Sequence, residues 1–300
     1  NAESFSMPWH RIQDELEEDR LNKTGSAFGS TRRGIAYAYS DKYRKKTLRL
    51  GDLLHLKEAY VQNRLHTMLE AEEQAELFAP YIYDTGTFLE EALAAGKKVV
   101  LEAQLGAMRD IDFGIFPYTS SSSTISAYGP IGAGIPGTGL DHVVGVLKAY
   151  STCVGAGPFT AQKAMSEDWM EDLRKAGGEY GAATGRPRRV GPFDAFASRY
   201  GLRCQKADKI ALTKLDVLSG MKEIPVITAY TKAGQILSAF DPTEDLESCE
   251  PVVKLLPGWQ KDISGCRSFA ELPREAKEYV AALEELLQHE IQFVSVGARR

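Results

Sequence analysis

The sequence predicts an α/β fold in which a single unit alternates helices with buried strands and adds β-hairpin excursions. A helix over residues 84–95, a glycine at 96 and an apolar segment over residues 98–102 follow one another as in one turn of such a fold. An amphipathic helix over residues 273–289, followed by a strand over 291–296, closes the sequence in the same order.

Each element follows from a local pattern. Asp84 and Thr85 are typical of a helix start and Gly96 of a helix end, while Asp194 caps a shorter helix. A turn at residues 232–234 joins the two strands of a hairpin. The other expected elements are a helix over 9–22 with Ile12, Leu16 and Leu21 on one side, a polar loop over 25–34, a long helix over 52–78, a glycine-rich segment over 129–139, a strand or short buried helix over 143–154, a helix over 194–200, a strand over 210–213 and hairpin strands over 224–230 and 235–240.

Composition and charge indicate a soluble globular protein that binds a small anion. Of the 300 residues, 43% are hydrophobic and 26% are charged, and the formal net charge is −5. This balance argues against a general nucleic-acid or membrane-surface binder, and no apolar run reaches the roughly 20 residues of a bilayer span. The four cysteines form no CxxC pair, so no zinc site is expected and the reducing cytoplasm is the predicted location.

Residues 177–189 form a glycine-rich segment that ends in a cluster of Arg186, Arg188 and Arg189. Arginine presents a planar fork of donors that matches carboxylate and phosphate oxygens, and glycines let the backbone approach a bound anion. The pattern predicts a clamp for a multiply anionic small molecule. A solvated basic turn is the alternative.

The strand expected over residues 210–213 ends in Thr-Lys-x-Asp, which places Lys214 and Asp216 at its carboxyl end. Ligands of α/β sheets bind off the carboxyl ends of strands. A carboxylate there can accept hydrogen bonds from the N1–H and the exocyclic amine of guanine, and a lysine stem can cover the base. The element resembles the Asn-Lys-x-Asp of GTP-binding proteins, and an ordinary salt bridge at a strand end is the alternative.

Two further loops are candidates for anion binding. Residues 119–124 are six consecutive hydroxyl side chains, which could cradle a phosphate with backbone N–H groups or only form a solvated loop. Residues 29–34 carry two arginines, with helix-surface charge as the alternative. Residues 132–137 match GxGxxG, but no strand leads directly into them and Pro136 argues against a helix there, so no dinucleotide site is predicted.

Together these segments resemble the adenylosuccinate synthetase family, in the family's order over nearly the whole chain. The matching segments are 29–42, 110–124, 148–159, 184–194, 212–218, 257–259 and 294–297. The resemblance implies a P-loop-NTPase-like central sheet, mostly parallel and flanked by helices, with the N-terminal part of the fold absent from these residues. It also implies GTP-dependent ligation of IMP and L-aspartate to adenylosuccinate, GDP and phosphate in AMP synthesis. The implied setting is a cytoplasmic homodimer that uses Mg²⁺, with no nucleic acid or membrane partner.

The resemblance implies five IMP-binding residues, which are Thr31, Lys45, Gln104, Ser120 and Arg186. Lys45 stands where the family has an arginine that reaches across the dimer to the IMP phosphate, so the charge is kept but the fork is lost. Arg44 is the candidate to replace it. Gln104 is displaced by one position from the family's glutamine, and Ser120 stands in place of a threonine.

Two further ligand sets are implied by the resemblance. The aspartate loop comprises Ala182, Ala183, Thr184, Gly185, Arg186, Pro187 and Arg188, and the GTP-binding residues are Arg188, Lys214, Leu215, Asp216, Ser295, Val296 and Gly297. The family has a threonine and an arginine where this sequence has Ala183 and Pro187. The loop is therefore expected to be stiffer and to lack one hydroxyl.

The family's phosphate loop, Gly-Asp-Glu-Gly-Lys-Gly-Lys, does not occur in these 300 residues. We therefore expect the general base, the general acid and the Mg²⁺ ligands upstream of Asn1, no catalytic or metal-binding residue within the chain, and no turnover by the 300 residues alone. A catalytically inactive purine-nucleotide-binding remnant or regulatory partner is the alternative. Within one domain over 1–300, the expected regions are 1–50 for IMP and dimer loops, 51–97 for helices, and 98–300 for the IMP-, aspartate- and GTP-binding α/β part.

Overall fold

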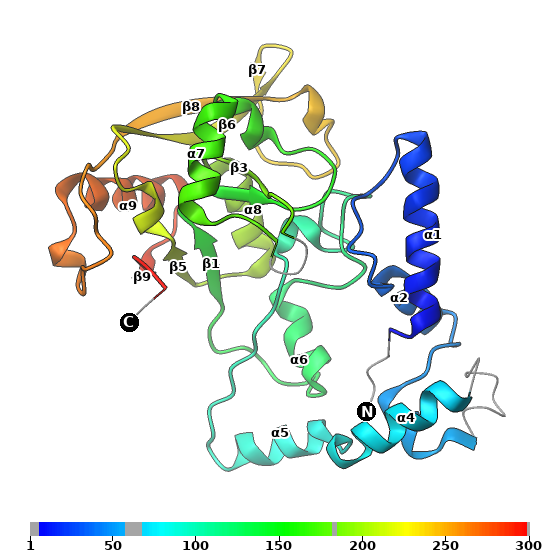
Figure 1. Ribbon diagram of the computed structural model, residues 1–300. Helices are drawn as coiled ribbons and strands as arrows, with labels where there is room; N and C mark the ends of the chain where they lie inside the picture. Colours follow the sequence, from blue (N-terminus) through cyan, green and yellow to red (C-terminus); the bar gives the residue numbers. More distant parts are fainter. Residues whose placement is uncertain (1–5, 58–67, 182–184, 299–300) are drawn as a thin grey trace. The chain divides into compact units, whose positions relative to one another are not determined.

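The computed structural model describes residues 6–57, 68–181 and 185–298, which belong to two compact units, residues 1–140 and 141–300 (Figure 1). Every named strand within these described ranges belongs to the second unit. Across the same ranges, none of the helices combines the length and the apolar character that a bilayer span requires. The finer division of the chain at residues 50 and 97 stays a prediction.

The first unit consists of helices joined by loops. The α-helices among its described residues are α1 (Pro8–Thr24), α2 (Ile35–Tyr43), α4 (Met68–Phe78), α5 (Thr85–Ala94) and α6 (Gly129–Ala133). Helix α5 confirms its predicted start, since Oδ1 of Asp84 accepts a hydrogen bond from the Thr87 N–H at 3.1 Å. Its predicted end is confirmed by Gly96, which follows the helix with a φ of 73°.

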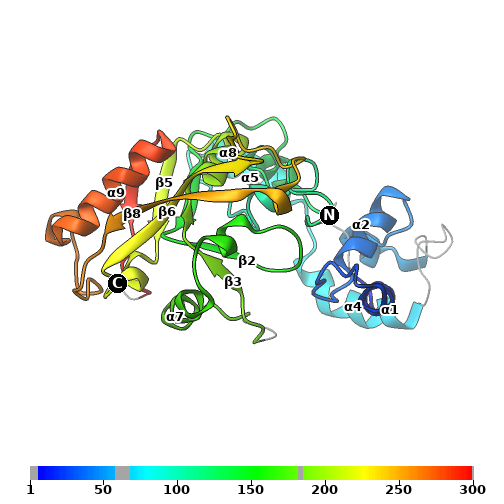
Figure 2. The same cartoon turned by 90° about the horizontal axis from the view of Figure 1, so that it is seen from above.

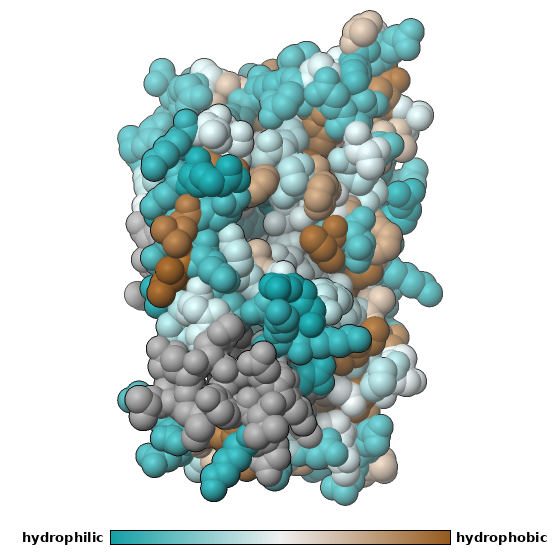
Figure 3. Space-filling model, turned by 90° about the vertical axis from the view of Figure 1, so that its right-hand side faces the viewer, coloured by the Kyte–Doolittle hydropathy of each residue, from teal (hydrophilic) through white to brown (hydrophobic). Residues whose placement is uncertain are grey.

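Helix α1 is present as predicted, but it buries the face opposite to the expected one. Ile12 and Leu16, on the predicted apolar side, are 56% and 67% exposed. The buried side chains are His10, Asp14 and Glu18, which lie on one face because residues four apart are neighbours on a helix. Figure 3 shows that hydrophobic side chains on this side of the molecule form separate patches in a mostly hydrophilic surface.

Two other predictions for the first unit are wrong. Residues 98–102 form no strand, and Val100 is 91% exposed. An apolar run becomes a strand only when another strand completes its backbone hydrogen bonds, and the described part of this unit has none. The long helix over 52–78 is also interrupted, because Leu50–Leu54 forms a 3₁₀ turn that ends at His55. Residues 58–67 of that prediction lie outside the described residues.

The second unit contains a three-stranded parallel sheet in the order β1 (Val144–Lys148), β5 (Lys209–Thr213) and β9 (Ile291–Val294). The sequence of residues 143–154 was compatible with a strand or a short helix, and the structure forms β1 and then β2 (Ser151–Cys153) there. Lys148 pairs with Thr213, and Leu212 pairs with Val294. The parallel register therefore brings the carboxyl ends of all three strands to one edge of the sheet.

Two further sheets, one of four strands and one of two, lie in the described part of the unit. The predicted hairpin is confirmed as β6 (Glu223–Lys232) and a short β7 (Gln235–Ile236). Figure 2 shows β6 running beside β8 (Glu250–Pro257), an antiparallel strand that the sequence did not predict. The remaining strands are β4 (Phe193–Asp194), parallel to β6, and β3 (Arg189–Gly191), which pairs with β2 and begins at the last arginine of the cluster.

The α-helices in the described part of the second unit are α7 (Glu167–Gly177), α8 (Ala195–Gln205) and α9 (Arg274–Leu287). The predicted cap of α8 is confirmed, since Oδ1 of Asp194 accepts from the Ala197 N–H at 2.9 Å. Helix α9 buries Tyr279 and Leu283 in the core, as its amphipathic pattern predicts. The Tyr279 hydroxyl donates to the Ala149 carbonyl at 2.7 Å and so fixes the chain just beyond β1.

Candidate functional site

The parallel sheet brings together the two chain segments predicted to bind GTP. Ser295 follows β9, and its N–H donates to the Leu212 carbonyl at 2.8 Å. The Ser295 carbonyl in turn accepts from the Leu215 N–H at 3.2 Å. Residues 214–216 and Ser295 therefore lie side by side at the carboxyl edge of the sheet, where α/β folds bind their ligands.

Residues 214–216 have the geometry of a ligand site. Lys214 adopts a left-handed backbone with a φ of 60° and precedes a 3₁₀ turn over Leu215–Leu218. Such backbone is uncommon for residues other than glycine and gathers at functional sites. Leu215 is fully buried and anchors the turn. The Oδ1 atom of Asp216 is buried without a hydrogen-bond partner among the described residues, which points to a ligand donor in that position.

Glu179 is a second carboxylate at this edge, beside Asp216, and the sequence did not predict it. Helix α7 ends at Gly177, and the left-handed Gly178 reverses the chain so that Glu179 is fully buried. Its oxygens accept hydrogen bonds from four side chains, which are Lys148 (2.9 and 3.0 Å), Tyr150 (2.6 Å), Arg188 (2.8 Å) and Lys214 (2.8 Å). One carboxylate thus joins three parts of the site. They are the end of β1, the loop that carries Arg186 and Arg188 (the arginine loop), and residues 214–216, which are predicted to bind guanine (the guanine-reading turn).

Three cations share this single carboxylate, and the shared charge sets the local pKa values. Burial alone would raise the pKa of Glu179, but hydrogen bonds from Lys214, Tyr150 and Lys148 outweigh it and lower that pKa to about 2. Burial lowers the pKa of Lys148, and the charges of Lys214 and Arg188 add to this effect. Because one negative charge faces three positive ones, the cluster keeps an excess of positive charge that favours an anionic ligand.

The arginine loop folds back on itself beside this cluster. Gly181 N–H donates to the Arg186 carbonyl at 2.8 Å, and Tyr180 forms a bridge with Pro187. Gly185, with a φ of 64°, takes the turn that most side chains avoid. Arg188 is held by Glu179, and its Nε atom is buried without a partner among the described residues. The predicted residues Ala182, Ala183 and Thr184 lie outside the described residues.

In the first unit, α1 holds the loop that carries Thr31. Asp14 accepts hydrogen bonds from the Ser30 hydroxyl at 2.7 Å and from the Gly34 N–H at 2.8 Å. Glu18 accepts from the N–H groups of Gly29 at 2.8 Å and Ser30 at 3.0 Å. These bonds explain why α1 buries its acidic face, and they leave Thr31 exposed at the surface of the loop.

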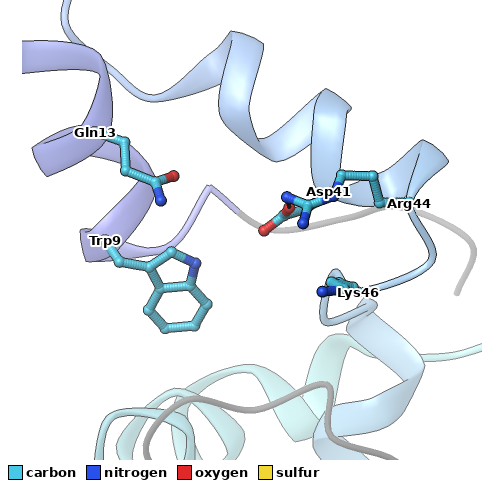
Figure 4. Close-up of a pocket in the computed structure, with 5 residues that line it drawn as sticks. All are labelled: Trp9, Gln13, Asp41, Arg44 and Lys46. Carbon is cyan, nitrogen blue, oxygen red and sulfur yellow. Dashed lines mark hydrogen bonds and ion pairs between the residues drawn. The ribbon is translucent and has the colours of Figure 1, made fainter. Parts of the chain in front are cut away.

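The candidate dimer residue Lys45 follows α2 in a left-handed backbone with a φ of 63°, and its side chain is exposed. Arg44, its candidate replacement, pairs instead with Asp41 at 3.2 Å. Figure 4 shows a pocket of about 440 Å³ in which Arg44 and Lys46 face Trp9 and Gln13 of α1. Lys45 does not line this pocket.

The other two IMP candidates of this unit lie on separate loops. Gln104 is exposed, and its carbonyl accepts from the Gly106 N–H at 2.8 Å. The Ser120 hydroxyl shares a hydrogen bond with the Ser122 hydroxyl at 2.8 Å. Asp110, which is 1% exposed, orders this hydroxyl loop by accepting from the Thr124 N–H at 2.6 Å. Hydrogen bonds therefore order this loop and hold the half-buried Ser120 in it, and such order is what a phosphate cradle requires.

Comparison with known proteins identifies the family of this chain. The sequence model of adenylosuccinate synthetase matches residues 1–300. An adenylosuccinate synthetase of Carboxydothermus hydrogenoformans is 38% identical over 98% of this chain and 73% of its own length, and one of Pelobacter propionicus is 41% identical with the same shares. The chain belongs to the adenylosuccinate synthetase family. A solved structure, the fully ligated adenylosuccinate synthetase of Plasmodium falciparum, superposes with a TM-score of 0.87 at 37% identity, over 96% of this chain and 73% of that one.

Family membership confirms the predicted fold class and the predicted function. The α/β fold is that of the Plasmodium falciparum adenylosuccinate synthetase, and the family is one of ligases, which the sequence resemblance led us to expect. GTP-dependent ligation of IMP and L-aspartate is the reaction of the adenylosuccinate synthetase family. The chain spans 73% of the length of the Carboxydothermus relative.

Sequence reasoning missed the residues that hold the candidate site in place. Lys148 and Tyr150 belong to a segment that carried the resemblance, but no role was predicted for them. Glu179 is the only charged residue of the glycine-rich run over 177–185, and a lone charge in such a run was the available signal. Asp14 and Glu18 gave no signal, because their partners lie in another part of the sequence.

Proposed function

We propose that the carboxyl edge of the β1–β5–β9 sheet binds GTP and L-aspartate in the family reaction. The observation that carries this proposal is the buried, unpartnered Oδ1 of Asp216 beside a cluster with excess positive charge. A nucleoside triphosphate would satisfy both features of this edge. The N–H groups of its base can donate to Asp216, and its phosphates bring negative charge to the basic cluster.

Asp216 is the group that would select guanine. Its carboxylate can accept from the N1–H and the exocyclic amine of guanine, whereas adenine offers no N1–H. The stem of Lys214 covers the base, and its ammonium is already fixed by Glu179 and by the Gly177 carbonyl at 2.7 Å. The buried side chain of Leu215 anchors the turn. Residues 295–297, which follow β9, would contact the base from the neighbouring strand end. The selectivity of this site therefore resides in a pre-organised turn.

Arg186 and Arg188 would hold L-aspartate. Arg188 keeps a buried Nε donor that no described residue satisfies, and Arg186 is exposed on the loop. Two carboxylates of one small substrate match two guanidinium forks. Gly185 and Pro187 flank Arg186 in the described part of this loop, and Arg188 is also within reach of GTP because Glu179 holds it beside Lys214.

The family reaction then proceeds in two displacements. IMP gives up its N1 proton as its 6-oxygen attacks the γ-phosphorus of GTP, the bond to the β–γ bridging oxygen breaks, and GDP leaves. The aspartate amine next attacks C6, phosphate leaves with the 6-oxygen, and the amine gives up a proton. The cations of this site would hold the aspartate carboxylates and offset charge on the phosphates, which stabilises the transition states electrostatically.

The first unit would supply the IMP contacts. Thr31 is presented by a loop that α1 holds, and Ser120 belongs to a hydroxyl loop ordered by Asp110. Gln104 is exposed beside Gly106. Lys45, exposed after α2, would reach the IMP phosphate of the other subunit in a homodimer in the cytoplasm. Its single ammonium gives a point-charge contact in place of a bidentate one.

The resemblance also implies Mg²⁺. Among the residues that the structure describes, no group of three His, Cys, Asp or Glu side chains is placed to hold a metal ion. The described residues therefore supply no ready-made set of three metal ligands, and every step above runs through the substrates and the basic side chains. The basic side chains named above act on the substrates directly.

Asp216→Asn tests the proposal. Because the amide replaces one acceptor with a donor, GTP affinity should fall about 10- to 100-fold relative to XTP, the range of one bidentate base contact. Nucleotide binding is measured by titration calorimetry. Asp262→Asn is the matched control, since that exposed carboxylate bonds to Ser264 in its own loop, away from the candidate site. An unchanged GTP-to-XTP ratio would show that Asp216 does not recognise guanine.

Turnover separates the ligase from the alternative of an inactive nucleotide-binding partner. The assay uses a polypeptide that also carries the family's phosphate-loop segment ahead of Asn1, called here the extended polypeptide. Phosphate release that requires GTP, IMP and aspartate together supports the ligase. Nucleotide binding without such release would favour the regulatory role.

A further inference from the structure

Glu179 occupies an unusual position, because one fully buried carboxylate bonds to every basic side chain of the cluster at the carboxyl edge of the sheet. It reaches them through the reversal after α7, and Gly177 is needed there since a Cβ would lie 2.3 Å from the Tyr150 hydroxyl oxygen. That hydroxyl donates to Glu179 at 2.6 Å. The backbone and the tyrosine therefore fix the carboxylate independently of the cations.

The two oxygens of Glu179 serve different parts of the site. Oε1 accepts from Lys214 at 2.8 Å and from Tyr150, whereas Oε2 accepts from Arg188 at 2.8 Å. Lys148 bridges both oxygens at 2.9 and 3.0 Å. One oxygen thus orients the lysine assigned to guanine, and the other orients the arginine assigned to aspartate and GTP.

Charge makes this arrangement dependent on Glu179. Without this carboxylate, the positive charges of Lys148, Arg188 and Lys214 would repel one another. Their side chains are 27–36% exposed, so water can solvate their charged groups if the carboxylate is neutralised. The expected response to loss of the charge is therefore a change of side-chain orientation in a protein that still folds.

We propose that Glu179 is a positioning residue of the ligase reaction, which holds Arg188 for aspartate and Lys214 for guanine through its two separate oxygens. This inference rests on the function proposed above for Arg188 and Lys214. Glu179 touches no substrate itself, because its two oxygens are occupied by protein donors.

Glu179→Gln tests the proposal through an asymmetry. The amide keeps one oxygen, which should stay with Lys214 and Tyr150 because more donors converge there, and it turns an N–H₂ group toward Arg188. The KM for aspartate should therefore rise by about 10-fold or more, the scale of one charged hydrogen bond, while the KM for GTP rises less. Both constants are measured in the extended polypeptide.

Tyr150→Phe is the matched control. It removes one hydrogen bond to Glu179 and leaves the negative charge and all three cations in place, so the KM for aspartate should rise clearly less than it does in Glu179→Gln. If Glu179→Gln is folded and leaves both KM values unchanged, the positioning role is overturned. An equal loss with Tyr150→Phe would assign the effect to packing and would overturn it as well.

Glu179→Asp covers the case in which the amide variant does not fold. It keeps the charge but withdraws the carboxylate by one methylene, so both KM values should rise and the GTP-to-XTP preference should weaken. Failure of both variants to fold, with Tyr150→Phe folded, would make the carboxylate purely structural and would overturn the proposal. The proposed function has its own test. If Asp216→Asn leaves GTP binding unchanged and Arg188→Lys leaves aspartate binding unchanged, the proposed function is wrong, whereas unchanged KM values in Glu179→Gln alone contradict only the role of Glu179.

Discussion

Arg188 and Lys214 donate to opposite oxygens of the same buried carboxylate, each at 2.8 Å from Glu179. The arginine loop and the guanine-reading turn are therefore held by a common charge, although they lie on separate elements. Arg188 still has an Nε donor without a partner among the described residues. Its guanidinium is thus oriented by the protein at one nitrogen and open to a ligand at another.

Arg188→Lys should weaken aspartate binding through loss of this second donor. Lysine can keep the ion pair with Glu179, but it has no fork and no Nε–H. We expect the KM for aspartate in the extended polypeptide to rise at least about 10-fold, as for a lost charged hydrogen bond. Arg274→Lys is the control, because its pair with Glu278 is on the surface. An aspartate KM that does not change would place the substrate carboxylates elsewhere.

Asp194 should make stability depend on pH. Complete burial raises the pKa of Asp194 to about 6, although the Ala197 N–H and the Tyr230 hydroxyl bond to it and oppose the shift. A carboxyl whose pKa is raised by folding stabilises the fold in its protonated form. Its contribution is full below the unfolded pKa near 4 and is lost as the pH rises through about 6, a change of roughly 3 kcal/mol.

Asp194→Asn tests this dependence, because asparagine can still cap α8 but does not titrate. Between pH 4.5 and 7.5, the fall in the free energy of unfolding seen for the wild type should be smaller in the variant. Urea denaturation at the two pH values measures it. The exposed Asp262→Asn should keep the wild-type slope, and an unchanged slope in Asp194→Asn would refute a raised pKa.

Local chemistry explains which elements the sequence could predict. The cap at Asp84 and the end at Gly96 depend on residues a few positions apart, and both were predicted correctly. The strand over 98–102 was wrong because a strand depends on a partner that the sequence of the segment does not contain. The apolar pattern of α1 was misleading for a similar reason, since Asp14 and Glu18 are buried by a loop that follows the helix.

The candidate site divides in the same way. Lys214 and Asp216 could be predicted because a strand end and its next residues form a contiguous motif. For Glu179 the sequence offered only a lone charge in a glycine-rich run, and its role could not be predicted, because that role arises only when Lys148 and Lys214, which are distant in sequence, converge on it in the fold. Sequence motifs thus identified the groups proposed to face the ligand, and the structure adds the carboxylate that holds them.

Asp14→Asn should loosen the loop that presents Thr31. Its two oxygens accept from the Ser30 hydroxyl and the Gly34 N–H, and an amide would turn a donor toward one of them. The free energy of unfolding should fall by about 1–3 kcal/mol, and the KM for IMP should rise. Asp19→Asn is the control on the same helix, because its surface pair with Arg32 is worth at most about 1 kcal/mol. Equal effects in the two variants would contradict the buried role of Asp14.

Gly34 is a point at which this loop approaches α1 closely, and Gly34→Ala tests that approach. A Cβ there would lie 2.6 Å from the backbone carbon of His10, and the backbone φ is 74°. Gly25, after α1, has a φ of 72°, but a Cβ added to it would meet no atom within 4 Å, so Gly25→Ala isolates the cost of the left-handed backbone alone. That cost is about 1–2 kcal/mol, and the clash in Gly34→Ala should add roughly 1–3 kcal/mol. Denaturant unfolding of the two variants measures the difference, and equal losses of stability would mean that the loop is free to move away from α1.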